Sequence, residues 1–331
     1  MEQLWLIFAA LAGIVILHIL NTILYDNIIN PYLESKEGFE DADKEPAEEI
    51  SGAVEESKGI VRWLDNSELY DTFYADIYNK LTQGAVRTQA EVGLIINEWT
   101  KRGDDIKKFE ILDAGCGTGI AVAAYAKLGV KGVTGMDSSA AMIKESEHTL
   151  SLTTLTTEEK QKIQWKNDDL MNPSANKGEE FTHASMMYFT IYYFPDKETV
   201  FRNLFFWIKP GGKLVVHVVN KHKFDPMLES STPWIGFSLQ KYSDTRVKKS
   251  EVTFNKFKYV GEFDLQDPQA EFRETFRFKD GKIRRQRHTF RMEDMNYIVE
   301  LATKVGWEYI GHVSLEMVGC EYMYHLHFKH P

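Results

Sequence analysis

The chain has 331 residues, 43% of them hydrophobic, and a formal net charge of -10, a size that allows one large domain or two small ones. The acidic excess lies at the start of the chain, because residues 1–59 contain 12 acidic residues and 3 lysines. Residues 60–331 contain the remaining 37 acidic and 36 basic residues and are almost neutral. A near-neutral globular part behind an acidic segment argues against a nucleic-acid partner, which requires clustered positive charge.

The first segment of the chain is apolar. Residues 4–24 read LWLIFAALAGIVILHILNTIL and contain no Asp, Glu, Lys or Arg. A helix of this length covers the hydrocarbon core of a bilayer, which is roughly 30 Å thick. A cleaved signal peptide would have a basic start and a shorter apolar run, and a buried soluble helix would have polar positions. We therefore expect one transmembrane anchor over residues 1–27, and the bilayer is the partner of residues 4–24.

The next segment is acidic. Residues 34–58 hold ten acidic residues and three lysines, with Gly and Pro and few large apolar side chains. Such a composition cannot supply a core and repels itself into an extended chain. The sequence therefore predicts a flexible linker over residues 28–59, followed by one folded domain over 60–331.

From residue 60 the pattern becomes globular. Two amphipathic helices are expected at 68–81 and 85–99, and alternating strands and helices follow them. The expected strands are 109–114, 132–137, 162–170, 184–189 and 213–220, and the helices between them are 121–129, 139–150 and 197–208. This alternation predicts an α/β fold with a parallel sheet covered on both faces.

The last part of the chain has a different pattern. Residues 251–291 alternate between apolar and polar side chains, and the Asp280-Gly281 pair between two such runs predicts a β-hairpin. A helix over 293–305 and two closing strands, 307–315 and 321–328, complete the expected elements. The last of these strands contains His325 and His327. Together with His330, these residues are interpreted as surface or packing residues and not as a metal site.

A glycine-rich loop joins the first strand to its helix and carries the strongest functional signal. It reads Asp113-Ala-Gly-Cys-Gly-Thr-Gly119. Glycines here let the backbone approach a ligand without Cβ clashes. The spacing differs from the G-x-G-x-x-G of dinucleotide folds, and the GK[ST] of triphosphate loops is absent. An acid at the strand end would repel pyrophosphate but suits a cationic ammonium group.

The loop ILDAGCGTG resembles the first motif of class I S-adenosylmethionine-dependent methyltransferases, and later segments follow the order of that family. VTGMDSSAAMI resembles the second-strand motif, which implies that Asp137 binds the ribose hydroxyls. KNDDL resembles the third-strand end, where an acid meets the adenine amine, and Asp169 is favoured over Asp168. LFFWIKPGGKLVVH resembles the turn before the fifth strand. The family pattern is broken by Thr182 in place of Asp and by Ser138 in place of an apolar residue.

The resemblance implies a Rossmann-like, seven-stranded sheet and S-adenosylmethionine as the cofactor. It also implies that the first aromatic helix, which contains Tyr78, closes over the cofactor. The cofactor-binding residues expected on this basis are Asp113, Gly115, Cys116, Gly117, Gly119, Asp137, Ser138, Met142, Asp168, Asp169, Leu170 and Tyr78.

Methyl transfer requires mainly that the nucleophile, the methyl carbon and the sulfur be held in line, with the reacting atoms about 3–3.5 Å apart. A general base is optional. Aromatic faces can stabilise a sulfonium or an ammonium ion. The catalytic candidates are therefore Tyr188 and Tyr192 after the fourth strand, with His217 as a base. Core packing is the alternative role for each tyrosine, and no metal is expected.

The insertion at about 221–291 resembles the antiparallel strands that cover the active site in small-molecule N-methyltransferases of this family, and we expect it to form a hairpin lid. Its basic side chains indicate either a solvated strand face or contact with anionic headgroups. The leading hypothesis is methyl transfer to a small-molecule, lipid or lipid-linked acceptor at a membrane surface. The alternatives are a protein methyltransferase acting on membrane neighbours and an inactive membrane-tethered scaffold. A cytosolic catalytic domain is expected because the cofactor is made there and because only Cys116 and Cys320 are present.

Overall fold

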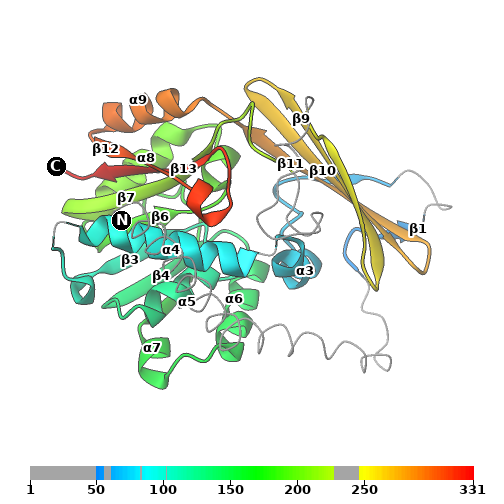
Figure 1. The fold of residues 1–331 in the computed structure, drawn as a ribbon. Coiled ribbons are helices and arrows are strands. Elements are labelled where there is room, and N and C mark those ends of the chain that lie inside the picture. Colours follow the sequence, from blue (N-terminus) through cyan, green and yellow to red (C-terminus); the bar gives the residue numbers. More distant parts are fainter. Residues whose placement is uncertain (1–49, 56–60, 83, 102, 227–245) are drawn as a thin grey trace, which may run out of the picture.

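The computed structural model describes residues 50–55, 61–82, 84–101, 103–226 and 246–331. These residues form an α/β layer built on a mostly parallel sheet and a separate antiparallel sheet (Figure 1). The anchor predicted for residues 1–27 lies outside the described residues. Among the residues that are described, no helix is both long enough and apolar enough to cross a membrane.

The larger sheet has seven strands among the described residues. Its order is β12-β13-β7-β6-β3-β4-β5. The strands are β3 (Glu110–Ala114), β4 (Gly132–Asp137), β5 (Ile163–Asn167), β6 (Phe181–Met186), β7 (Ile208–Val219), β12 (Glu308–Ser314) and β13 (Met323–Lys329). Strands β3 to β7 pair in parallel, and β13 pairs antiparallel with both β7 and β12. The predicted alternation of strands and helices is confirmed.

Helices cover both faces of this sheet because its central strands are apolar on both sides. One face packs against α4 (Gly84–Thr100) and α5 (Ile120–Lys127), and the other against α8 (Lys197–Trp207) and α9 (Met295–Val305). Helices α6 (Ala140–Leu152) and α7 (Thr157–Gln161) flank β4 and β5. Short 3₁₀ turns lie at η4 (Ile106–Lys108), η5 (Thr190–Tyr193) and η8 (Glu316–Val318).

The antiparallel sheet is built from the predicted hairpin region. Its main strands are β8 (Lys249–Thr253), β9 (Phe257–Gln266), β10 (Gln269–Phe278) and β11 (Lys282–Arg291). The turn at Asp280-Gly281 joins β10 to β11, and Gly281 has a φ of 84°. Two short strands, β1 (Val54–Glu55) and β2 (Trp63–Leu64), also pair with β11. Residues 54–55, which the predicted linker includes, pair with β11 in the structure, and the linker boundary at residue 59 stays a prediction.

The antiparallel sheet docks at the carboxyl ends of the parallel strands. Its strand β11 contacts η5, which follows the carboxyl end of β6. The ring of Phe290 on β11 lies 5.9 Å from that of Phe189, and helix α3 (Thr72–Thr82) places Phe73 against Phe257 and Phe276. The expected role of this insertion as a lid over the active site stays a prediction. Figure 1 shows α3 between the two sheets.

The exposed face of the antiparallel sheet carries charges of both signs. Lys249 and Arg273 both approach Glu262, and Arg287 approaches Glu271. Arg284, one of the basic side chains of the insertion, is instead fully buried and forms an ion pair with Asp71. The cross-strand ion pairs favour a solvated strand face over an anionic-headgroup surface.

Candidate functional site

The glycine loop has one position that is open to a ligand. Gly115, Gly117 and Gly119 all have positive φ, between 52° and 79°. A Cβ at Gly115 would lie 2.5 Å from Thr190, and one at Gly119 would lie 2.6 Å from Trp165, so these two glycines allow close packing. A Cβ at Gly117 would meet nothing within 4 Å. Gly117 is therefore the glycine at which a cofactor can approach the backbone.

Asp137 lies at the end of β4, and both of its carboxylate oxygens are fixed by backbone donors. The Gly117 N–H donates to Oδ2 and the Ser139 N–H donates to Oδ1, each at 2.9 Å. Burial raises the pKa of Asp137 from its ordinary value, although these two donors oppose the rise. The carboxylate is thus oriented beside Gly117 and keeps lone pairs for the two hydroxyls of a ribose.

Asp113 lies behind the loop rather than at its surface. It is 1% exposed and accepts a hydrogen bond from Ser185 Oγ at 2.8 Å. Burial raises the pKa of Asp113 to about 7, with a smaller rise from the charge of Asp137. A cationic ammonium group beside Asp113 would favour its ionised form. The predicted ammonium contact stays a prediction.

The remaining predicted cofactor residues differ in how far they are buried. Asp168 is partly buried and its carboxylate accepts from the Asp169 N–H and from Asn172, whereas Asp169 is exposed. Ser138 is exposed, and Met142 and Leu170 are buried in the core. The Cys116 thiol is 8% exposed, and burial holds its pKa well above the ordinary value, which fits a small loop residue rather than a nucleophile.

Helix α3 and the segment before it are tied to the cofactor region by contacts that sequence reasoning missed. Thr118 Oγ1 in the glycine loop donates to Asn79 Oδ1 at 2.6 Å, and Ser139 Oγ donates to the Tyr70 carbonyl at 2.6 Å. The ring of Tyr70 lies 6.4 Å from that of Tyr78. In the sequence, only the spacing of the aromatic residues indicated that this helix lies at the cofactor region. It identified Tyr78 but not the polar residues that fix the helix in place.

The three predicted catalytic residues have different environments. Tyr188 is partly buried, has a φ of 52°, and stacks under the Arg87 guanidinium at 4.2 Å. Tyr192 is 1% exposed and its hydroxyl accepts from the Val219 N–H, so it packs against β7. His217 is fully buried and faces Glu91. Tyr188 is therefore the one of the three that is accessible to an acceptor, and the catalytic role of each stays a prediction.

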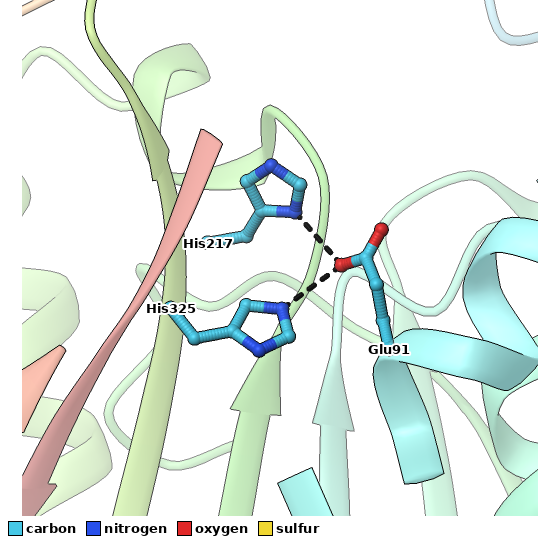
Figure 2. A group of neighbouring side chains, drawn as sticks. All are labelled: Glu91, His217 and His325. Atoms are coloured by element: carbon cyan, nitrogen blue, oxygen red, sulfur yellow. Dashed lines mark hydrogen bonds and ion pairs between the residues drawn. The ribbon is translucent and has the colours of Figure 1, made fainter. Parts of the chain in front are cut away.

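A buried cluster joins α4 to strands β7 and β13. Glu91 Oε2 lies 3.0 Å from His217 Nδ1 and 2.9 Å from His325 Nε2 (Figure 2). Arg87 Nε lies 3.3 Å from the other oxygen, Glu91 Oε1. Burial alone would raise the pKa of Glu91, but the two histidines outweigh this and lower it. The sequence analysis did not anticipate this cluster, because its members are separated by more than 100 residues.

The ligand types of this cluster could hold a metal ion. The three ligand atoms lie within 4.8 Å of one another. Arg87 already balances the carboxylate charge, and an added cation would lie close to that guanidinium. The charge of Arg87 beside Glu91 therefore favours a hydrogen-bonded cluster. The expected absence of a metal stays a prediction that metal analysis of the purified protein would test.

A second buried network connects the antiparallel sheet to η5. Glu274 Oε2 lies 2.7 Å from His288 Nε2, and His288 Nδ1 lies 2.6 Å from the Tyr193 hydroxyl. The Tyr193 and Tyr70 hydroxyls are 2.6 Å apart. Neither Glu274 nor His288 was among the sequence candidates, because single polar residues within alternating strands carry no distinctive pattern.

Comparisons with known proteins identify a family for most of the folded region. The model of a family described as methyltransferase domain matches residues 70–250, which is more than half of the chain. None of the curated proteins resembles the chain closely enough to count as a relative.

Solved methyltransferase structures share the fold. An S-adenosylmethionine-dependent methyltransferase from Clostridium acetobutylicum has a TM-score of 0.57 at 16% identity, covering 78% of this chain and 97% of that chain. The CcbJ methyltransferase from Streptomyces caelestis has a TM-score of 0.55 at 13% identity, covering 79% and 98%. CalS10, an amino pentose methyltransferase from Micromonospora echinaspora solved with S-adenosylmethionine bound, has a TM-score of 0.52 at 15% identity, covering 74% and 92%.

Proposed function

The chain belongs to the methyltransferase domain family and uses S-adenosylmethionine as its methyl donor, and we propose that it methylates a small-molecule or lipid-linked acceptor at a membrane surface. The bound cofactor supplies an electrophilic methyl group on a sulfonium. Asp137 holds the ribose hydroxyls, and the open face of Gly117 leaves room for the cofactor. The partly buried tyrosines Tyr70, Tyr78 and Tyr188 supply aromatic faces that attract a cation.

The observation that carries the proposed acceptor class is the docking of the antiparallel sheet. Strand β11 packs against η5, at the end of the sheet where Asp137 and Gly117 lie. A cover of this kind excludes water and strengthens polar interactions beneath it. It also favours a compact acceptor over a folded protein. The shared fold of an amino pentose methyltransferase supports the same class.

The alternative of an inactive scaffold is supported in the sequence only by Thr182, and the structure gives that residue another role. Thr182 stands where the resemblance predicts Asp, and in the structure its Oγ1 accepts from the Glu110 N–H and donates to the Glu110 carbonyl. The side chain therefore joins β6 to β3 at the start of these strands. The substitution leaves the arrangement of Gly117 and Asp137 intact.

Turnover is the test of this proposal. Purified full-length protein with radiolabelled S-adenosylmethionine should transfer label to at least one member of a panel of amino sugars, free amino acids and aminophospholipid vesicles. Asp137→Ala should lower the transfer at cofactor concentrations that do not saturate the variant. Label that appears only in added membrane proteins, with the whole panel unlabelled, would replace this proposal with the protein-methyltransferase alternative.

The membrane context rests on residues 4–24 and is a separate part of the proposal. A central apolar residue contributes about -0.3 to -0.6 kcal/mol to insertion, whereas a charged one costs about 2.5–3.5 kcal/mol. The structure describes the chain from residue 50 on. A connection over residues 28–49 that behaves as a flexible chain would span about 25 Å. Such a connection would keep the active site near the bilayer surface.

Alkaline carbonate extraction tests the anchor. The full chain should stay in the membrane pellet, and the double variant Ile14→Asp, Ile16→Asp should be released. The pair Glu48→Gln, Glu49→Gln changes charge outside the apolar run and serves as the matched control that should stay in the pellet. Release of the unaltered protein would refute the anchor and, with it, the preference for a lipid-linked acceptor.

A further inference from the structure

The chain of hydrogen bonds from Glu274 to Tyr70 has a defined direction. Glu274 is fully buried, and although burial raises its pKa, its contacts with His288, Gln286 and Tyr259 outweigh this and lower it. It is therefore a carboxylate and can only accept. Tyr259 donates to its Oε1 at 2.8 Å and Gln286 donates to its Oε2 at 2.6 Å. In its neutral form, His288 then carries its proton on Nε2, which leaves Nδ1 as an acceptor.

The two tyrosines continue this direction towards the cofactor region. With His288 Nδ1 as the acceptor, the Tyr193 hydroxyl donates to it, and the Tyr193 oxygen accepts from Tyr70. The Tyr70 hydroxyl oxygen, which donates its proton to Tyr193, retains lone pairs. The backbone of Tyr70 lies beside the cofactor region, because its carbonyl accepts from Ser139 Oγ and the Ser139 N–H donates to Asp137. Burial raises the pKa of Tyr70 and of Tyr193 well above the ordinary value. Neither phenol can therefore keep a negative charge, and a proton that enters at Tyr70 must end on His288.

We propose that Tyr70, Tyr193, His288 and Glu274 form a proton relay that deprotonates an acceptor amine arriving as an ammonium ion. An ammonium N–H bond breaks and the proton passes to the Tyr70 oxygen, while the proton of Tyr70 moves to Tyr193 and that of Tyr193 moves to His288 Nδ1. The imidazolium formed lies against the Glu274 carboxylate. The neutral amine then forms a bond to the methyl carbon as the carbon–sulfur bond breaks, and the electron pair of that bond stays on sulfur.

The surroundings of His288 fit a group that gains and loses one proton. The groups that face its ring are Glu274 from β10, Tyr193 from η5 and Tyr74 from α3, whose hydroxyl lies 3.3 Å from Nε2. Within the described residues, the cation Arg284 is neutralised by Asp71 and contacts Gln286 rather than His288. The negative charge of Glu274 thus balances the positive charge that His288 gains with the transferred proton. This pairing lowers the free-energy cost of burying the imidazolium.

The first test needs no acceptor. Full-length protein labelled with ¹⁵N-histidine is examined by long-range proton–nitrogen correlation at pH 7.5, and the His288 signals are assigned by their loss in His288→Gln. The relay requires a neutral ring with its proton on Nε2. A ring protonated on Nδ1, or one doubly protonated before any acceptor is present, would overturn the proposal.

The second test uses the best amine of the acceptor panel and rests on the proposed function. Glu274→Gln should lower kcat at pH 7.5 at least tenfold, with recovery as pH rises towards the pKa of the amine, because free amine then needs no relay. Tyr193→Phe interrupts the relay without removing a charge and should show the same recovery. Glu271→Gln, on the exposed face of the same strand, is the control. All variants should bind S-adenosylmethionine like the unaltered protein.

The two hypotheses fail in different ways. If the unaltered protein binds no S-adenosylmethionine, the proposed function fails. If it binds and turns over, but Glu274→Gln and Tyr193→Phe leave both kcat and its pH profile unchanged, the relay alone fails. A uniform loss of rate at every pH would indicate a structural role for these residues and would also refute the relay.

Discussion

Gly117→Val is expected to weaken S-adenosylmethionine binding more than a hundredfold, which corresponds to about 2.7 kcal/mol. Gly117 has a φ of 52°, and its missing Cβ would point into space that is free of protein atoms within 4 Å. In the proposed site that space belongs to the cofactor, so a branched side chain would occupy it. The same residue donates its N–H to Asp137, and a shift of the backbone would also disturb that carboxylate. Calorimetric titration of the full chain measures the effect.

Gly129→Val separates this effect from backbone strain. Gly129 has a φ of 85° and likewise has open space around its Cβ position, but it follows the last turn of α5, at the other end of that helix from the loop. Both variants place a branched residue in the left-handed region, which costs stability. Only Gly117→Val should lose cofactor affinity. Equal losses of affinity in the two variants would show that strain, and not obstruction of the site, is the cause.

Glu91→Ala is expected to lower the free energy of unfolding by about 3–5 kcal/mol, which is the usual cost of removing one partner from a buried ion pair. Arg87 is only 9% exposed, and the substitution removes the carboxylate with which it forms an ion pair. It also removes the acceptor that His217 and His325 share. These residues hold α4 against β7 and β13. Denaturant unfolding of the full chain at pH 7.5 provides the measurement.

Glu98→Ala is the control on the same helix. Glu98 pairs with Lys101 near the carboxyl end of α4, where the lysine side chain is 57% exposed. Surface pairs of this type contribute about 0–1 kcal/mol, so this variant should unfold almost like the unaltered protein. If Glu91→Ala were equally mild, the cluster would not be the link between helix and sheet that we describe.

The sequence predicts the larger sheet well because each of its signals is local. An apolar strand, the glycine loop from Gly115 to Gly119 and the acid at Asp137 lie within one short segment, and their spacing alone sets the backbone geometry. The Asp280-Gly281 turn is local in the same way, and the hairpin at this position is confirmed.

The polar clusters escape prediction because they are tertiary. Glu91, His217 and His325 meet only when α4 packs across strands that are distant in sequence. His217 carries no signal that separates a base facing the acceptor from a fully buried ring. The pairing of residues 54–55 with β11 escapes prediction for a similar reason. Strand β1 is two residues long, and it forms only because β11 offers an edge for pairing.

The central claim is that S-adenosylmethionine binds with its ribose at Asp137, beside Gly117. Calorimetric titration of the full chain should give one cofactor per chain. Asp137→Ala should lower the affinity at least roughly tenfold, or about 1.4 kcal/mol, because it removes charge-assisted hydrogen bonds to the ribose, and its circular dichroism should match that of the unaltered protein. Unchanged affinity in a folded Asp137→Ala variant would contradict the account, because the ribose would then bind elsewhere.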